Sequence, residues 1–336
     1  MKAVKLIKPG PISGQPLDLQ DVPVPDPGPG QLLIKVMSCG VCRSNLHMVE
    51  GDWLPGCPSF TPITPGHEVI GEVVATGAET VQFSAGDLVG VMPLWSTCGV
   101  CEFCLSGVDE LCQSKEITGE TVDGGYAEYM LATEAYAFAI PEGLDGVSAA
   151  PLFCPGITGY GAVQKAALSP GKSVGVFGVG GVGHVALQFA ALTGAEVVAV
   201  SRGSARLDMA TEFGAHRTLD SSAGDAGKIL QADGGLDAAL VFAPSDDVVD
   251  QAVQSLKPGG TLVLGVNATV RDFPFALEQR IVGSLLGSRA MMREVLSLAA
   301  AGKVRVATES RPLTEARQAL TDLKEGKVAG RLVLVP

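Results

Sequence analysis

The sequence lacks three features that would point to other classes of protein. It has no excess of positive charge, because 24 lysines and arginines stand against 36 aspartates and glutamates, a net charge of −12. That balance argues against nucleic acid or an anionic membrane surface as a partner. The sequence has no uninterrupted apolar run of the ~18 residues that a membrane-spanning helix needs, and no internal repeat. We therefore expect neither a nucleic-acid partner nor a membrane partner.

A secretion signal is also missing from the amino-terminal stretch M-K-A-V-K-L-I-K-P-G, where lysines are scattered among the apolar residues. The chain nevertheless has 8 cysteines. Without a secretion signal these indicate a reducing compartment, in which thiols bind metals more often than they form disulfides. We expect a cytoplasmic protein.

The length and composition predict a compact α/β protein with two domains. With 336 residues, 46% of them hydrophobic and 18% charged, the chain exceeds one ordinary core. Residues 1–150 alternate short strand patterns with glycine and proline turns, which predicts an irregular, mostly β domain. Residues 151–287 alternate strand and helix patterns, which predicts a doubly wound parallel sheet. In residues 288–336 two helical patterns precede a closing strand at Arg331–Val335, and the pattern alone leaves open which domain they join.

A glycine-rich turn lies between an apolar run, Ser173–Phe177, and an alanine-rich helical pattern that stops at Gly194. A second strand pattern follows, so the turn stands where G-x-G-x-x-G of a dinucleotide-binding fold stands. Residues without a Cβ let the backbone turn tightly and let a pyrophosphate approach the helix N-terminus. The competing interpretation is that the glycines only allow close helix–strand packing. The expected cofactor contacts here are Gly178, Gly180, Gly181, Val182 and Gly183.

Four cysteines in a glycine-flanked loop, residues 95–115, form the first candidate metal site. Cys98, Cys101, Cys104 and Cys112 have the spacing C-x2-C-x2-C-x7-C. Four thiolates so close together suit one tetrahedral zinc with no open position, a structural site. An iron–sulfur cluster and unbound thiols are the alternatives, but the last gap and the absence of a following proline differ from the bacterial ferredoxin pattern.

The second candidate site is dispersed along the chain. Cys42, His67 and Cys154 supply two thiolates and one imidazole, the donor set of a catalytic zinc with an open fourth position. Spacing cannot prove that these residues converge. Taken singly, Cys154 is also a plausible core cysteine and His67 an ordinary, partly buried histidine.

Seven motifs along the chain occur in the order of one known family: G-V-C-R-S-N-L-H, G-D-W, P-G-H-E-V-I-G-E-V, the four-cysteine loop, D-G-G-Y-A-E-Y, G-V-G-G-V-G and G-K-V-A-G-R-L-V-L. On these motifs the chain resembles the zinc-dependent alcohol dehydrogenases of the medium-chain dehydrogenase/reductase superfamily over essentially its whole length. The resemblance implies a GroES-like catalytic domain (1–150), a Rossmann domain (151–287) and a return to the catalytic domain (288–336). It also implies a homotetramer, with a homodimer as the alternative.

The resemblance also implies roles for single residues. Cys42, His67 and Cys154 are the implied zinc ligands. Glu68 is an alternative or transient ligand, or a carboxylate that holds an arginine behind the metal. Ser44 takes the proton of the alcohol and His47 passes it outward, although an exposed histidine without a role is the alternative. Further implied contacts are Arg43 and Thr158 with the cofactor, and Trp53 and Trp95 with the substrate, unless both tryptophans only fill the core.

Two positions depart from the family pattern. The family usually has aspartate at Asn45, near the histidine ligand, so this chain has one negative charge fewer beside the metal. At the end of the second Rossmann strand, NAD-specific folds have an acidic residue. This chain has Ser201 and Arg202, with Arg206 one turn on, and a hydroxyl with guanidinium groups suits a 2′-phosphate. We therefore expect NADP(H), with NAD(H) as the alternative.

The sequence thus predicts a zinc-dependent alcohol dehydrogenase or aldehyde reductase with a catalytic and a structural zinc. A polyol, formaldehyde or aryl-alcohol dehydrogenase on the same scaffold is the alternative within the enzymes. A zinc- and nucleotide-binding redox sensor without turnover is the alternative outside them. A zinc-free quinone or enoyl reductase is disfavoured by both cysteine sets, and Cys39 and Cys57 are expected to be structural thiols.

Overall fold

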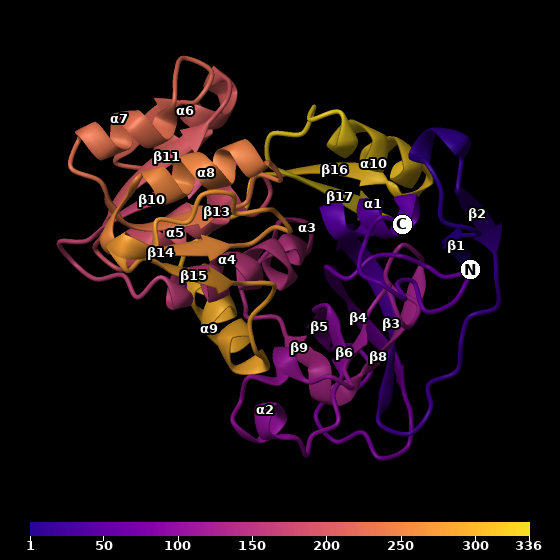
Figure 1. The fold of residues 1–336 in the computed structure, drawn as a ribbon. Coiled ribbons are helices and arrows are strands. Elements are labelled where there is room, and N and C mark those ends of the chain that lie inside the picture. The colour runs from indigo at the N-terminus through magenta and orange to yellow at the C-terminus, as the bar shows by residue number, and fades with distance from the viewer. The chain divides into compact units, whose positions relative to one another are not determined.

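Two sheets contain most of the strands in the computed structural model, which describes residues 1–336 (Figure 1). Its contacts divide the chain into two units. The first unit comprises Met1–Cys154, Ser288–Ala300 and Arg305–Pro336, and the second comprises Pro155–Gly287 with Ala301–Val304. Apart from the short segment Ala301–Val304, the chain passes between the units after Cys154 and after Gly287, near the changes of sequence pattern at residues 150 and 287.

The first unit is built on a 7-stranded sheet in the order β16-β17-β3-β4-β5-β9, with β8 paired to β3. In the central strand, β3, Ile34 and Val36 are buried while Lys35 and Met37 are exposed, the alternation of a half-buried strand. The strands are β3 (Gln31–Gly40), β4 (Val69–Thr76), β5 (Leu88–Val91), β8 (Tyr129–Thr133), β9 (Ala137–Ala139), β16 (Thr308–Pro312) and β17 (Arg331–Val335). Because β17 pairs with β3, the carboxyl end of the chain joins this sheet.

Further strands and helices complete this unit. Two further strand pairs are β1 (Lys2–Leu6) with β2 (Leu17–Asp21), and β6 (Leu94–Ser96) with β7 (Glu116–Ile117). The helices are α1 (Arg43–Glu50), α2 (Glu102–Leu105), α3 (Gly146–Ala149), α9 (Arg289–Ala300) and α10 (Ala316–Lys324).

The second unit contains a 6-stranded, wholly parallel sheet in the order β12-β11-β10-β13-β14-β15. The order reverses between β10 and β13, as in a dinucleotide-binding fold. The inner strands are apolar runs buried on both faces, as helix-covered parallel strands require. The strands are β10 (Ser173–Phe177), β11 (Glu196–Ser201), β12 (Arg217–Asp220), β13 (Leu236–Val241), β14 (Leu256–Leu264) and β15 (Arg280–Gly283). The helices are α4 (Pro155–Lys165), α5 (Gly183–Leu192), α6 (Ser204–Glu212), α7 (Ala226–Ala232) and α8 (Asp246–Gln254).

The predicted fold class, a doubly wound parallel sheet plus a mostly β part, is confirmed. Six strands have no counterpart among those predicted from the sequence: β2, β6, β7, β9, β12 and β16. In β2, β12 and β16 most side chains are exposed or half-buried, so these strands lack the apolar signal that marked the others. The other three, β6, β7 and β9, have only two or three residues each. Among the helices, none is long and apolar enough to cross a membrane.

Candidate active site

Four predicted site residues converge in the first unit. The ligand atoms of Cys42, His67, Glu68 and Cys154 all lie within 4.8 Å of one another, and all four residues are buried. The Sγ atoms of Cys42 and Cys154 are 3.7 Å apart. A tetrahedral zinc with Zn–S bonds of ~2.3 Å separates its sulfur ligands by ~3.8 Å. The two thiols therefore have the spacing of zinc ligands.

The His67 ring completes this donor set. Its Nε2 atom is buried and has no hydrogen-bond partner, an arrangement that is costly unless the atom binds something. The Cys154 thiol lowers the pKa of Cys42 by hydrogen bonding, with Arg331 and His67 adding to the effect against burial. This donor set fits a zinc ion. It consists of two sulfurs, of which that of Cys42 is more easily deprotonated to the thiolate, and a free imidazole nitrogen.

Asn45 and Tyr126 hold the other side of the His67 ring. The Asn45 Nδ2 lies 3.4 Å from His67 Nδ1, and the Tyr126 hydroxyl lies 3.4 Å from Asn45 Oδ1. A histidine that binds metal through Nε2 carries its proton on Nδ1 and needs an acceptor there. Rotation of the amide puts the Asn45 oxygen in that place, with the Tyr126 hydroxyl accepting from the amide nitrogen. Asn45 can therefore replace the family aspartate as a neutral acceptor.

Glu68 is held by an arginine. Arg331 of β17 donates from Nε to Glu68 Oε2 over 3.1 Å and from Nη2 to Oε1, and both side chains are buried. A Cβ at Gly40 would lie 1.9 Å from Glu68 Oε2, so only glycine leaves room for the carboxylate. Burial raises the pKa of Glu68, and Arg331 opposes this. Of the two roles predicted for Glu68, the structure therefore shows the one in which the carboxylate holds an arginine.

Helix α1 presents Ser44 and His47 three residues apart, and thus on neighbouring positions of one face. The Ser44 hydroxyl donates to Cys42 Sγ over 3.2 Å. His47 Nδ1 lies 2.9 Å from Asp52 Oδ1, and the ring stacks on Trp53 with 5.9 Å between centroids. The His47 side chain is partly exposed.

The remaining predicted residues of the first unit have ordinary partners. Arg43 donates from Nη2 to the Leu323 carbonyl over 3.1 Å. Trp95 is buried in the core of this unit, and Trp53 packs against the same core. The cofactor role of Arg43 and the substrate roles of both tryptophans stay predictions.

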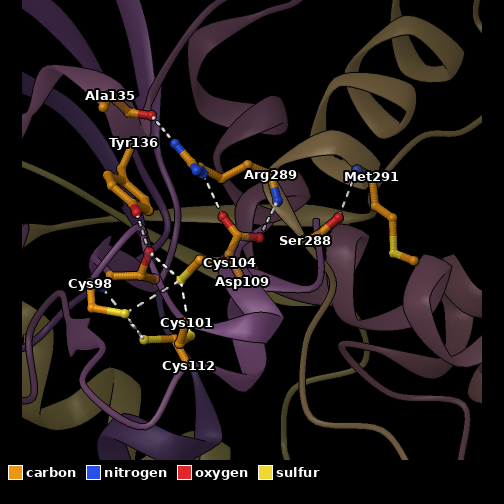
Figure 2. Close-up of polar contacts among 11 residues, drawn as sticks. Cys98, Cys101, Cys104, Asp109, Cys112, Ala135, Tyr136, Ser288, Arg289 and Met291 are labelled. Carbon is orange, nitrogen blue, oxygen red and sulfur yellow. Dashed lines mark hydrogen bonds and ion pairs between the residues drawn. The ribbon is translucent and has the colours of Figure 1, made fainter. Parts of the chain in front are cut away.

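The four-cysteine loop brings its sulfurs together (Figure 2). The Sγ–Sγ distances are 3.9 Å for Cys98–Cys104, 3.5 Å for Cys101–Cys104 and 3.6 Å for Cys112–Cys98. These values again match the ~3.8 Å edge of a zinc–thiolate tetrahedron and exceed a disulfide bond. The backbone N–H groups of Val100 and Cys101 lower the pKa of Cys98 to about 6. Although the Cys104 backbone opposes it, burial and the neighbouring thiols raise the pKa of Cys101 to about 11. The loop thus favours the thiolate at Cys98 but not at every cysteine.

Asp109, within this loop, attaches it to α9 (Figure 2). The Asp109 carboxylate accepts from Arg289 Nε over 2.5 Å, and the Arg289 guanidinium lies over the Tyr136 ring, 4.3 Å from its centroid. The Tyr136 hydroxyl lies 2.6 Å from Thr97 Oγ1, next to Cys98. The loop is therefore fixed to the first residue of α9 by charge and by ring contacts.

The glycine turn of the second unit has the local geometry of a nucleotide site. Gly178 has φ +98°, which a side chain would strain, and a Cβ at Gly183 would lie 2.0 Å from the Gly178 carbonyl oxygen. A Cβ at Gly180 would meet nothing within 4 Å, so the backbone is open there. The N–H groups of Gly181, Val182 and Gly183 donate to no protein acceptor. One glycine makes the turn, one leaves room for a ligand, and one allows helix–strand packing.

The residues after β11 lie at the same edge of the sheet. Ser201 ends the strand and is buried, whereas Arg202 is exposed and forms no ion pair or hydrogen bond. Asp220 pairs in register with Ser201, and its carboxylate accepts from Ser222.

Thr158 lies on α4, where its hydroxyl donates to the Leu285 carbonyl over 3.4 Å.

A dinucleotide-type turn together with two metal-type donor sets is typical of a metal- and nucleotide-binding enzyme. Comparisons with known proteins give its family. Residues 28–142 match the family model "Alcohol dehydrogenase GroES-like domain", and residues 181–301 match "Zinc-binding dehydrogenase".

Among curated relatives, an alcohol dehydrogenase of Moraxella sp. (strain TAE123) is 38% identical over 96% of both chains. Among solved structures, the alcohol dehydrogenase of the archaeon Aeropyrum pernix superposes with a TM-score of 0.93 at 32% identity, covering 100% of both chains. The acetophenone reductase of Geotrichum candidum, solved in complex with NAD, superposes with a TM-score of 0.89 at 28% identity, covering 100% of this chain and 97% of that one.

The chain therefore belongs to the zinc-dependent alcohol dehydrogenases of the medium-chain dehydrogenase/reductase superfamily. It is an oxidoreductase that requires zinc and a nicotinamide cofactor, and the general reaction of the family is hydride transfer. The predicted family and enzyme class are confirmed.

Sequence reasoning missed some residues around the site. Asp52 contacts the His47 ring, and Tyr126 contacts Asn45. Glu120 contacts Trp53. Asp52 and Tyr126 lie inside the family motifs G-D-W and D-G-G-Y-A-E-Y. The motifs drew attention to these residues but did not indicate what either one does. Glu120 carried no signal at all.

Proposed function

We propose that the protein interconverts alcohols and aldehydes at a catalytic zinc held by Cys42, His67 and Cys154. One observation carries the proposal: the buried His67 Nε2 atom has no partner, and the His67 ring offers a nitrogen within 4.8 Å of two sulfurs that are 3.7 Å apart. When bound there, zinc supplies a Lewis acid that lowers the pKa of an alcohol and polarises an aldehyde carbonyl.

Ser44 and His47 would move the proton. Ser44 Oγ lies beside Cys42 on the same face of α1 as His47, so it is placed to accept the alcohol proton. Asp52 accepts from His47 Nδ1, which leaves Nε2 as the nitrogen that exchanges protons. His47 then delivers the proton to solvent through its exposed edge. Glu68 acts in this proposal as the counter-charge of Arg331, with ligation of the metal as the alternative.

A second, structural zinc is proposed for Cys98, Cys101, Cys104 and Cys112. Four sulfurs at tetrahedral spacing leave no position for a substrate, so this metal would only stabilise the loop.

NADP(H) is the proposed cofactor. The free N–H groups of the glycine turn suit the pyrophosphate. The unpaired, exposed Arg202 beside Ser201 suits a 2′-phosphate, and Arg206 follows in the first turn of α6. Side-by-side titrations of NADPH and NADH test this, and NADPH should bind at least about tenfold more tightly. Tighter binding of NADH would contradict a phosphate role for Arg202.

The chain is also proposed to form a homo-oligomer, a tetramer with a dimer as the alternative, in the cytoplasm. Strand β15 ends its sheet, so its outer edge has no strand partner. Exposed apolar side chains lie on this strand and on the segments that flank it in the sequence: Phe273, Phe275, Leu277, Ile281 and Leu285. A second copy related by a two-fold axis would cover both the edge and these side chains. Sedimentation velocity should detect the oligomer, and a monomer at micromolar concentration would contradict it.

Metal removal tests the catalytic proposal. Dialysis against a chelator should abolish alcohol oxidation, and added zinc should restore it in the wild type but not in Cys42→Ser. Nucleotide affinity should be unchanged in Cys42→Ser, because the glycine turn is intact. Turnover by metal-free enzyme or by Cys42→Ser would contradict the proposal.

A further inference from the structure

Glu120 is a buried carboxylate for which the proposed mechanism has no use. Only 7% of the residue is exposed. Its Oε2 atom accepts from Trp53 Nε1 over 3.2 Å and from the Cys57 thiol over 3.5 Å. Its Oε1 atom accepts no hydrogen bond and, unlike the unpartnered Nε2 of His67, is not fully enclosed. One oxygen of the carboxylate is therefore committed to the protein, and the other is open.

The backbone places Glu120 beside the catalytic cluster. Gly119 packs on the residue before His67, because a Cβ at Gly119 would lie 2.6 Å from the Gly66 nitrogen. The backbones at Gly66 and Gly119 are therefore in contact. His67 follows the first of these glycines, and Glu120 follows the second. Burial raises the pKa of Glu120, and the neighbouring His67 opposes that rise.

Trp53 connects Glu120 with the expected proton route. Its indole donates to Glu120 and stacks on the His47 ring. Glu120 therefore lies with Trp53 and His47, whereas Glu68 faces Arg331. No lysine or arginine neutralises Glu120, since its side-chain partners are Trp53 and Cys57.

We propose that Glu120 determines substrate specificity by accepting a hydrogen bond at Oε1 from a second donor group of the alcohol. The preferred substrates are then alcohols that also bear a hydroxyl or an ammonium group, namely diols, polyols or amino alcohols, rather than simple aliphatic alcohols. This inference rests on the proposed function, because it places the reacting hydroxyl at the Cys42–His67–Cys154 cluster. A bound substrate without a donor would shield Oε1 from water and leave it unpaired, which is how a polar site discriminates.

Glutamine and methionine at this position separate the two kinds of donor. In Glu120→Gln, the Trp53 and Cys57 donors keep the amide oxygen at the Oε2 position, so the amide NH2 takes the place of Oε1. A hydroxyl can accept from that NH2 group, but an ammonium group cannot. Glu120→Met removes both possibilities.

The experiment measures kcat/KM for straight-chain alcohols from ethanol to pentanol, each matched with the diol and the amino alcohol of the same length. Zinc-loaded wild type should prefer one of the two-donor series over the plain alcohols by at least about tenfold. Glu120→Met should remove that preference while plain alcohols change little. Glu120→Gln should remove a preference for amino alcohols but keep one for diols. Glu116→Gln, an exposed neighbour whose carboxylate accepts from Ser96, is the control and should behave as wild type.

The outcomes separate the inference from the proposed function. Wild type that oxidises plain alcohols best overturns the specificity role, and this arm needs no variant to fold. Equal losses on all substrates in both variants would show that Glu120 only positions Trp53. A zinc-loaded wild type that oxidises no alcohol would instead count against the proposed function.

Discussion

Replacing Glu68 should be one of the most destabilising single substitutions near the site. In Glu68→Gln the buried Arg331 guanidinium keeps its charge and loses its counter-ion, although the amide oxygen can still accept one hydrogen bond. Glu68 is 0% exposed and Arg331 4% exposed, so water cannot compensate. Removing one partner of a buried ion pair costs about 3–5 kcal/mol. For a folding unit of this size that loss lowers the melting temperature by roughly 10 °C.

Thermal unfolding followed by circular dichroism, with zinc content measured on the same samples, tests this prediction. Glu72→Gln is the control, because Glu72 lies exposed on the same strand, β4, and should change the free energy of unfolding by less than about 0.5 kcal/mol. The double variant Glu68→Gln/Arg331→Met should regain much of the loss, since it also removes the unpaired charge. If Glu68→Gln with full zinc content unfolds within about 1 kcal/mol of wild type, the ion pair is not what stabilises this region.

Three further predictions concern other parts of the chain. Cys104→Ser should lose the metal of the four-cysteine loop and melt at a lower temperature while nucleotide affinity stays unchanged; normal metal content and stability would rule out a structural zinc. Arg202→Ala should weaken NADPH binding by about tenfold and leave NADH binding nearly unchanged, and an equal effect on both would exclude recognition of the phosphate. Burial alone would raise the pKa of Asp237, but hydrogen bonds from Lys257, Ser173 and Lys172 lower it. Asp237→Asn should therefore cost about 2 kcal/mol at neutral pH, and urea titrations should find the difference shrinking as the pH falls below the unfolded-state pKa of 3.8. A difference independent of pH would contradict the charge-based explanation.

The sequence predicted the second unit well because its signals are local. Apolar runs that are buried on both faces marked β10 and β11, and the glycines between strand and helix marked the turn. The three turn glycines differ physically in the structure, and only Gly180 leaves open space. The edge strand β12, with the sequence R-T-L-D, has no such signal, because an edge strand needs little burial.

The first unit was harder to predict because its contacts join distant parts of the chain. Arg331 contacts Glu68, which is 263 positions away in the sequence, and Arg289 contacts Asp109, which is 180 positions away. Neither pairing follows from periodicity or spacing. The convergence of Cys42, His67 and Cys154 likewise rested on resemblance, since the three lie on separate elements. Glu120 could not be found in advance, because its burial depends on how the loops of Trp53 and Cys57 fold over it.

The most direct test of the catalytic cluster is to count zinc ions per chain and to measure alcohol turnover in wild type and His67→Ala. We predict two zinc ions and turnover in wild type. We predict one zinc ion, no turnover and unchanged nucleotide binding in His67→Ala, because only the cluster of Cys42, His67 and Cys154 is broken. A His67→Ala variant that keeps both zinc ions and its turnover would contradict the account.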